Sequence, residues 1–405
     1  MSWHKPFTKL VPRLEAARII DKNVNQINRV EEVRLEEAAG RVLAADLVAH
    51  SNIPPFNRSS MDGYALRAAD THGASESKPK QLKLLGVAYA GEPFTGIVGG
   101  GECVEIATGS PLPEGADAVI MVEYTRPCGK GVEMMREAKL GDNIEHSGED
   151  IKSGDTVVNA GDVLTAGKIG AAAALGVISL GVYAKPTVAL YSSGNEIVPQ
   201  GKPLGPGQVY DINTHTLTSI VEANGCVALR KGLVPDDEQT MLVTVKQAGN
   251  YDAVVFSGAS SVGTRDFFAQ TVERLGIVHF HGLQVKPGKP TLFGTVQGTP
   301  VFGMPGNSTS CLSNAYVFLI PMLRKMARLP AVETRTVKAK LTRLIKSDGE
   351  REVFYTVRLE NGKAVPVFKR SSNITSMAHA DGMIIIPART KRLEAGSQVN
   401  VYLFS

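Results

Sequence analysis

The four cysteines of this 405-residue sequence are scattered, and no two of them form a Cys-x-x-Cys pair. Their spacing suits neither a disulfide framework nor a zinc site, so the sequence favours a reducing compartment such as the cytoplasm. The sequence also lacks an apolar run long enough to span a bilayer, and its start, MSWHKPFTKL, carries no signal-peptide core. We therefore expect a cytoplasmic protein that makes no membrane contact.

A strong charge of either sign is absent too. The chain carries 44 basic and 40 acidic residues, mixed along its length, for a formal net charge of +4. A nucleic-acid-binding protein would show a basic stripe or block, so we expect no nucleic-acid partner. The hydrophobic fraction, 43%, is instead typical of globular domains with real cores, and the length suits about two to four of them.

The order of apolar patterns predicts an α/β part flanked by β-rich parts. In residues 186–329 strand patterns alternate with helical ones, which predicts a parallel sheet with helices on both faces. Residues 82–123 read as short strands between glycines, so a small β-rich domain is expected at about 51–150. Beyond residue 330 the pattern is again strand-like, with Asn361-Gly362 as a hairpin turn, which predicts a separate C-terminal β domain.

One stretch, residues 251–266 (YDAVVFSGASSVGTRD), organises the α/β part. Its apolar run at 253–256 suits a strand buried on both faces of a parallel sheet. The small residues 257–263 follow at once, and such a loop can aim several backbone N–H groups at one anion. Asp266 then begins a helical pattern close to this loop. A plain strand–turn–helix connection is the alternative if the stretch stood alone.

Loops at 193–196 and 235–237 follow two more strands of the same predicted sheet. They place Glu196 and Asp236, together with Asp266, on the edge where open α/β sheets bind ligands. Carboxylates beside backbone N–H donors are a common arrangement for phosphate with Mg²⁺. Each acid taken alone is more often a helix cap or a surface group, so the prediction depends on their joint placement.

Further anion-binding elements are expected at this edge. Residues 303–307 (GMPGN) precede a long helical pattern at 308–329, whose N-terminus could hold an anion with help from Ser308 and Thr309. The turn KPGKP at 286–290 adds two ammonium groups. The edge is therefore expected to offer both hydrogen-bond donors and positive charge to an anionic ligand.

Seven motifs, in order, resemble those of the molybdopterin molybdenumtransferase (MoeA) family, also seen as the C-terminal domain of gephyrin. Each motif is moderately specific alone, and the ordered set, which covers essentially the whole chain, is strongly so. The motifs are PPFNRSSMDGYA (54–65), ATGSPLPEGADAVI (107–120), SGEDI (147–151), SSGNEIV (192–198), SGASSVGTRD (257–266), KPGKP (286–290) and GMPGN (303–307).

The resemblance implies a multidomain α/β and β fold. Its four implied domains are a three-layer α/β domain with a mainly parallel sheet, molybdopterin-binding and MogA-like (5–26 and 178–328), an elongated α/β linker region (27–50 and 151–177), an inserted β-rich domain (51–150) and a C-terminal β-barrel domain (329–405). The resemblance also implies a homodimer, with a site between the α/β domain of one subunit and the loop-bearing domain of the other.

The implied activity is a Mg²⁺-dependent transferase reaction of molybdenum cofactor biosynthesis, which inserts molybdate into adenylylated molybdopterin and releases AMP. The implied protein partners are the molybdopterin adenylyltransferase and acceptor molybdoenzymes. The implied catalytic positions are Asp62, Thr108, Asp150, Glu196, Asp236 and Asp266, of which Glu196, Asp236 and Asp266 would bind the metal. The implied cofactor-binding positions are Ser257, Gly258, Ser261, Gly263, Lys286, Lys289, Pro305, Gly306, Asn307 and Ser371.

The sequence departs from the family pattern where the anion should be held. Glu145 and Thr356 stand where a relative has arginine, Gly282 stands where one has lysine, and Asn57 replaces a frequent aspartate. Charge-assisted contacts are the strong ones, so lost cations bear on activity. The arginines that could replace them are Arg58, Arg265, Arg351 and Arg358.

Three hypotheses therefore remain open. The intact acids and the intact KPGKP turn favour an active molybdenum insertase. The missing cations motivate a second hypothesis, a paralogue that binds pterin or nucleotide without inserting molybdenum, or that uses another oxyanion. The third hypothesis is a gephyrin-like scaffold, whose dimer interface and C-terminal β domain would bind a partner peptide.

Overall fold

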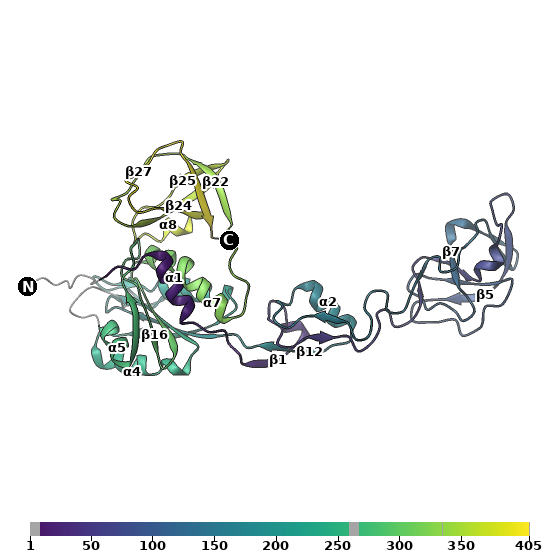
Figure 1. Cartoon of the computed structure of the whole chain (residues 1–405), viewed down its shortest axis with the longest axis horizontal. Helices are drawn as coiled ribbons and strands as arrows, with labels where there is room; N and C mark the ends of the chain where they lie inside the picture. The colour runs from purple at the N-terminus through teal and green to yellow at the C-terminus, as the bar shows by residue number, and fades with distance from the viewer. Residues whose placement is uncertain (1–8, 259–266, 334, 405) are drawn as a thin grey trace, which may run out of the picture. The chain divides into compact units, whose positions relative to one another are not determined.

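The computed structural model describes residues 9–258, 267–333 and 335–404 (Figure 1). The chain forms two compact units. The first comprises Met1–Glu31, Gly40–Val42 and Val182–Ser405, and the second comprises Glu32–Ala39 and Leu43–Gly181. No helix within the described ranges is both long and apolar enough to cross a membrane. All four cysteines are described and are free thiols, as their spacing predicts.

The first unit is built around a six-stranded sheet with the strand order β16-β13-β17-β21-β20-β18. Its strands are β13 (Thr187–Ser193), β16 (Val227–Val234), β17 (Ala253–Ser257), β18 (Gly276–His281), β20 (Leu292–Val296) and β21 (Thr299–Met304). β16, β13, β17 and β21 run parallel, whereas β20 and β18 are antiparallel to their neighbours. The sheet is therefore mainly parallel, with two antiparallel pairings at one edge. The reason is a two-residue hairpin turn, Gln297-Gly298, in which both residues have positive φ.

Helices cover both faces of this sheet, as expected (Figure 1). α1 (Arg13–Lys22), α3 (Asn213–Ala223), α6 (Ser308–Asn314) and α7 (Ile320–Met326) pack on one face, and α4 (Glu238–Lys246) and α5 (Phe267–Leu275) pack on the other. Strand alternation separates the two cores: Val188 and Leu190 belong to the first, and Ala189 and Tyr191 to the second. The predicted three-layer α/β arrangement with a mainly parallel sheet is confirmed.

The long helix expected over residues 308–329 is interrupted. A π-helical turn, Ala315–Leu319, separates α6 from α7. Pro321 lies in the first turn of α7 and has no N–H to donate, so it cannot make the regular α-helical hydrogen bond to the carbonyl four residues earlier. The wider π register accommodates this missing bond, and α7 then continues to Met326.

The C-terminal part of the first unit is a closed barrel of five strands. They are β22 (Thr336–Leu341), β24 (Glu352–Glu360), β25 (Lys363–Pro366), β26 (Gly382–Ile386) and β28 (Gln398–Leu403). The ring runs β24-β25-β22-β28-β26 and closes where β26 pairs with β24. The predicted Asn361-Gly362 turn joins β24 to β25, with φ values of 50° and 75°. β19 (Val285–Lys286) adds to β24 and so connects the barrel with the α/β part.

The second unit holds a six-stranded sheet with the order β7-β4-β6-β5-β9-β8. Its strands are β4 (Gly63–Leu66), β5 (Lys80–Ala88), β6 (Glu102–Ile106), β7 (Ala118–Met121), β8 (Thr125–Cys128) and β9 (Gly131–Met134). Two small cores contain Leu66 and Ile106 respectively. The strand-rich structure expected from the glycine-punctuated sequence is confirmed in this unit.

Shorter elements complete the described chain. The strands are β1 (Val30–Arg34), β2 (Leu47–Val48), β3 (Arg58–Ser59), β10 (Ile144–Glu145), β11 (Thr156–Val158), β12 (Ser179–Tyr183), β14 (Ile197–Val198), β15 (Val209–Tyr210), β23 (Ile345–Lys346) and β27 (Arg392–Leu393). The helices are α2 (Ala166–Ala174), α8 (Thr375–Ala378) and the 3-10 turns η1 (Leu35–Glu37), η2 (Ala68–Thr71), η3 (Val122–Tyr124) and η4 (Ala248–Asn250). Of these, β2 pairs with β11, β3 with β10, β14 with β15, and β23 with β27.

Candidate functional site

The carboxyl end of β13 carries two serines, and the first of them joins three other side chains. Ser192 Oγ lies 2.9 Å from Asp211 Oδ2, 2.7 Å from Thr214 Oγ1 and 3.1 Å from Ser257 Oγ. Asp211 also accepts a 3.0 Å hydrogen bond from Thr214 N–H at the start of α3. Of these four residues, only Ser257 was predicted as a site residue. Asp211 was not, because an acid just before a helical pattern is typical of a helix cap.

The second serine, Ser193, holds Asp236 at the same edge by donating a hydrogen bond to its carboxylate. The next residue, Asp237, is the N-cap of α4 and accepts a 2.8 Å bond from Thr240 N–H. Capping is therefore the role of Asp237. The exposed carboxylate of Asp236 is left free of that role and available to a ligand.

Glu196 lies close to the end of β13 as well, and its side chain is exposed. A Cβ placed on Gly194 would lie 2.8 Å from Glu196 Oε2, so this carboxylate lies over the residue next to Ser193. Glu196 and Asp236 therefore share one strand end. Their expected third partner, Asp266, lies outside the described residues. Within the described ranges, no three His, Cys, Asp or Glu side chains are gathered to hold a metal.

Two glycine loops pack against each other at this edge. A Cβ on Gly258, whose φ is +86°, would lie only 2.2 Å from the carbonyl oxygen of Ser193. Gly258 N–H donates to Met304 O at 3.1 Å, and a Cβ on Gly306 would lie 3.3 Å from Gly258 Cα. The predicted residues brought together here are Ser257, Gly258, Pro305, Gly306 and Asn307. The predicted Ser261 and Gly263 lie outside the described residues.

The N-terminus of α6 is covered by the segment 371–373 rather than open to an anion. Thr309 N–H, Thr309 Oγ1 and Ser308 Oγ donate to carbonyl oxygens of this segment at 3.0, 2.8 and 3.2 Å. Both hydroxyls and the Thr309 N–H are therefore used within the chain, so these three donors do not serve an anion as expected. The same contacts bring Ser371 to the GMPGN loop, where its Oγ accepts a 3.1 Å bond from Asn307 Nδ2.

Both predicted lysines, Lys286 and Lys289, lie on the turn 286–290. Lys286 Nζ donates a 3.0 Å hydrogen bond to Asp348 Oδ2, and this bond is the main reason that the pKa of Asp348 lies below its usual value. Asn314 Nδ2 fixes the turn itself by donating to the carbonyl oxygen at its glycine at 2.9 Å. The ammonium group of Lys286 is about half exposed and remains within reach of solvent anions.

In the second unit, the structure brings together Asp62 and Thr108. Asp62 Oδ1 accepts hydrogen bonds from Thr108 N–H at 2.7 Å and from Thr108 Oγ1 at 2.8 Å. These two bonds, the backbone one first, hold the pKa of Asp62 below its usual value, so the exposed carboxylate stays charged at neutral pH. Asp150 belongs to the same unit and is also exposed, and its N–H donates to Ile53 O at 3.1 Å.

The described arginines that could replace the missing cations are each engaged with a carboxylate. The pairs are Arg58–Glu145 at 2.8 Å, Arg351–Asp348 at 3.6 Å and Arg358–Glu360. Arg265 lies outside the described residues. None of the three described arginines of this set is therefore a free cation that could replace the missing ones. Thr356, one of the departures, is fully buried in the barrel, where its Oγ1 has no hydrogen-bond partner among the described residues.

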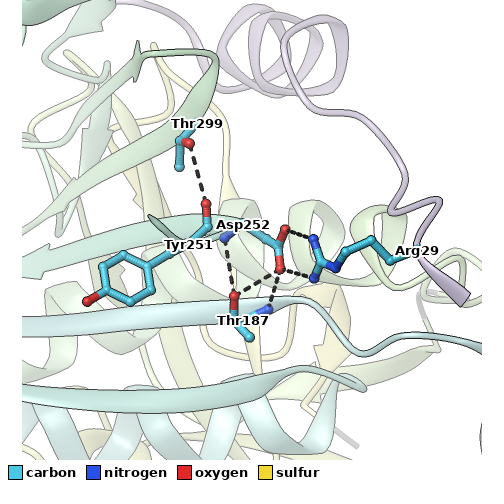
Figure 2. Close-up of polar contacts among 5 residues, drawn as sticks. All are labelled: Arg29, Thr187, Tyr251, Asp252 and Thr299. Carbon is cyan, nitrogen blue, oxygen red and sulfur yellow. Dashed lines mark hydrogen bonds and ion pairs between the residues drawn. The ribbon is translucent and has the colours of Figure 1, made fainter. Parts of the chain in front are cut away.

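The opposite, amino end of the sheet is fastened by one ion pair (Figure 2). Arg29 donates to both carboxylate oxygens of Asp252 at 2.6 and 2.7 Å, and Asp252 also accepts from Thr187 N–H at 2.8 Å and Thr187 Oγ1 at 2.9 Å. Burial of the carboxylate opposes its charge, but the bonds from Arg29 and Thr187 outweigh burial and lower the pKa of Asp252. Thr187 begins β13, and Asp252 precedes β17. These hydrogen bonds therefore help to fix the two strands that present Ser192 and Ser257.

Three family models match the chain. They are the MoeA N-terminal region (domain I and II) over residues 11–176, the "Probable molybdopterin binding domain" over residues 189–325, and the MoeA C-terminal region (domain IV) over residues 338–404.

Individual relatives match over nearly their whole length. The chain is 32% identical over 392 residues to a molybdopterin molybdenumtransferase of Haemophilus influenzae, and the match covers 93% of this chain and 94% of the relative. It is 32% identical over 404 residues to a molybdopterin molybdenumtransferase of Bacillus subtilis, covering 97% and 94%. Among solved structures, a molybdopterin biosynthesis MoeA protein from Pyrococcus horikosii matches with a TM-score of 0.84 at 37% identity, covering 98% and 100%.

Proposed function

The chain belongs to the MoeA family of molybdopterin molybdenumtransferases, and on this premise we propose that it inserts molybdate into adenylylated molybdopterin with release of AMP. As a member of this family it is a transferase of molybdenum cofactor biosynthesis. The observation that carries the finer proposal is the carboxyl edge of the six-stranded sheet, where two exposed acids, two packed glycine loops and Ser371 meet.

This edge suits a ligand that is both phosphorylated and bulky. Gly258 and Gly306 have no side chains, which lets phosphate oxygens approach the backbone of the two loops closely. The hydroxyls of Ser257 and Ser371 add further hydrogen-bonding groups at the same loops. We propose that Lys286 and Lys289 bind the negatively charged oxygens of the phosphate and of the molybdate substrate, since charge-assisted hydrogen bonds are the strongest.

The donor chemistry of the edge fits Mg²⁺, which prefers oxygen ligands such as carboxylates and phosphates. Glu196 and Asp236 lie at one strand end and, with Asp266, would hold the ion. A bound Mg²⁺ would neutralise the charge that these carboxylates share with the phosphate oxygens. Without it, the acids would repel the ligand that the glycine loops bind.

The remaining assignments follow from family membership and are part of the same proposal. We propose a cytoplasmic homodimer, which receives its substrate from the molybdopterin adenylyltransferase and passes its product to acceptor molybdoenzymes. Asp62, Thr108 and Asp150 are assigned to catalysis on the same basis. Four domains, over 5–26 with 178–328, 27–50 with 151–177, 51–150 and 329–405, remain our division of the chain.

Two neighbouring aspartates provide a matched test. Asp236→Asn should weaken Mg²⁺-dependent binding of AMP roughly ten- to a hundredfold, because a charge-assisted contact is worth about 1.5–3 kcal/mol. Asp237→Asn should keep the wild-type affinity, because asparagine caps α4 as well as aspartate does. Isothermal titration with AMP, in Mg²⁺ and in EDTA, measures both variants. Equal affinities for the two variants in Mg²⁺ would refute the role of Asp236.

The pairing of Arg58, Arg351 and Arg358 with carboxylates favours one alternative, a paralogue that binds pterin or nucleotide without inserting molybdenum. In that case molybdate would find too little positive charge to bind. Titration with molybdate and with tungstate, in the presence of AMP and Mg²⁺, separates the two functions. A micromolar, Mg²⁺-linked molybdate response supports insertion, and AMP binding without any oxyanion response supports the paralogue.

A further inference from the structure

Asn213, the first residue of α3, has one amide atom paired and one unpaired. Its side chain is only 7% exposed. Nδ2 donates a 2.9 Å hydrogen bond to the carbonyl oxygen of Gly306. Oδ1 is buried and has no hydrogen-bond partner among the residues that the structure describes.

An unpaired buried acceptor is unusual because it loses its water without gaining a donor in exchange. An apolar side chain of similar size would fill the same space without this cost. The unpaired Oδ1 is therefore a cost to the ligand-free site, and such a cost is typical of groups kept for binding.

The position of the amide indicates what it serves. Gly306 belongs to the GMPGN loop, and a Cβ on Gly306 would lie 3.3 Å from Gly258 Cα. Since Oδ1 and Nδ2 belong to the same amide, the unpaired acceptor lies beside the place where the two glycine loops meet. The partner must be a donor, and ionised phosphate or molybdate oxygens only accept hydrogen bonds. The anionic parts of a ligand therefore cannot satisfy Oδ1.

We propose that Asn213 is a specificity residue of this site: its Nδ2 fixes the GMPGN loop, and its Oδ1 accepts a hydrogen bond from an N–H donor on a heteroaromatic ring of the ligand. This inference rests on the proposed function, whose substrate carries two such rings, a pterin and an adenine. Both rings present amino or ring N–H donors, so the chemistry is shared and the experiment must tell them apart.

Two asparagines of one helix give a matched pair of variants. Asn224, at the other end of α3, is also 7% exposed, and its Nδ2 donates to Ile220 O at 2.7 Å. Asn213→Leu removes the acceptor together with the Nδ2 bond to Gly306 O, and Asn224→Leu is the control at an equally buried asparagine. The probes are AMP and a pterin monophosphate, each titrated by calorimetry into the full-length protein with Mg²⁺. Thermal unfolding of the ligand-free variants is measured in parallel.

Asn213→Leu should weaken the binding of one probe about tenfold, the size of one lost hydrogen bond. It should lower the Tm of the ligand-free protein less than Asn224→Leu does, because the unpaired buried acceptor is removed together with the bond to Gly306. Asn224→Leu should lower the Tm and bind both probes as the wild type does. Loss of pterin binding alone assigns the donor to the pterin, and loss of AMP binding alone assigns it to the adenine. Wild-type affinity for both probes in Asn213→Leu would overturn the inference but not the proposed function. An equal loss of affinity for both probes, which a displaced GMPGN loop would cause, would overturn it as well. A wild type that binds neither probe would overturn both.

If Asn213→Leu does not fold, a crystal structure of the wild type with the bound probe decides. A ring N–H within hydrogen-bonding distance of Oδ1 supports the proposal. A water molecule bonded to Oδ1 both with and without the probe overturns it.

Discussion

Replacing Gly258 by alanine should cost more stability than replacing Gly298, although the two glycines have nearly the same backbone conformation. Their φ angles are +86° and +81°, so each alanine would be forced into the left-handed region. That strain costs about 1–2 kcal/mol at either position. A Cβ at Gly298 would meet nothing within 4 Å, whereas a Cβ at Gly258 would lie 2.2 Å from the carbonyl oxygen of Ser193. Relieving this overlap requires a backbone shift, which costs about 1–3 kcal/mol more.

Urea unfolding followed by circular dichroism measures both losses. We expect Gly298→Ala to lower the free energy of unfolding by about 1–2 kcal/mol and Gly258→Ala by about 2–5 kcal/mol. Gly258→Ala should also separate the two glycine loops and weaken AMP binding. Gly298→Ala, in the turn between β20 and β21, should bind AMP as the wild type does. Equal losses of stability in the two variants would refute the close packing of Gly258 on β13.

Three further predictions concern acids. Asp252→Asn should lower the free energy of unfolding by about 1–3 kcal/mol at pH 7. The folded pKa of Asp252 lies below its ordinary value of 3.8. The stabilisation by its charge is therefore complete above pH 3.8 and is lost as the pH falls through the folded pKa. The difference in free energy of unfolding between the two proteins should therefore shrink as the pH falls below 3.8, and a constant difference would contradict this. Thr108→Val should raise the pKa of Asp62 in a ¹³C NMR titration, since one of its two hydrogen bonds is lost; an unchanged pKa would rule out that bond. Asp62→Asn and Asp236→Asn should each lose activity roughly ten- to a hundredfold, and a mixed dimer should regain activity if each site draws on both chains. Measured subunit exchange without recovery would reject a shared site.

The local features of the fold could be predicted from the sequence, because they depend on residues close together in the chain. The Asn361-Gly362 turn follows from the positive φ that both residues adopt readily. The strand at 253–257 follows from its apolar run, which is buried throughout. The break in the helix at 315–319 was missed because its cause, one proline, is tolerated within the first turn of a new helix.

The polar contacts of the site could not be predicted in the same way, because they join distant residues. Asn213 and the Gly306 carbonyl lie 93 positions apart, and no local pattern marks the asparagine. Thr309 and Asn373 are 64 positions apart, so the hydrogen bond that uses the Thr309 hydroxyl could not be seen in the sequence. Asp236 was predicted as a site residue, whereas the capping role of Asp237 became clear only from its hydrogen bond with Thr240.

The central claim is the transfer of molybdenum, and AMP release measures it most directly. The purified chain is incubated with adenylylated molybdopterin, Mg²⁺ and increasing molybdate, and AMP is quantified by chromatography while an added apo-molybdoenzyme reports the finished cofactor. We predict AMP release that requires Mg²⁺, saturates with molybdate and matches the cofactor formed mole for mole. Binding of the adenylylated pterin with no AMP released at any molybdate concentration would contradict the claim.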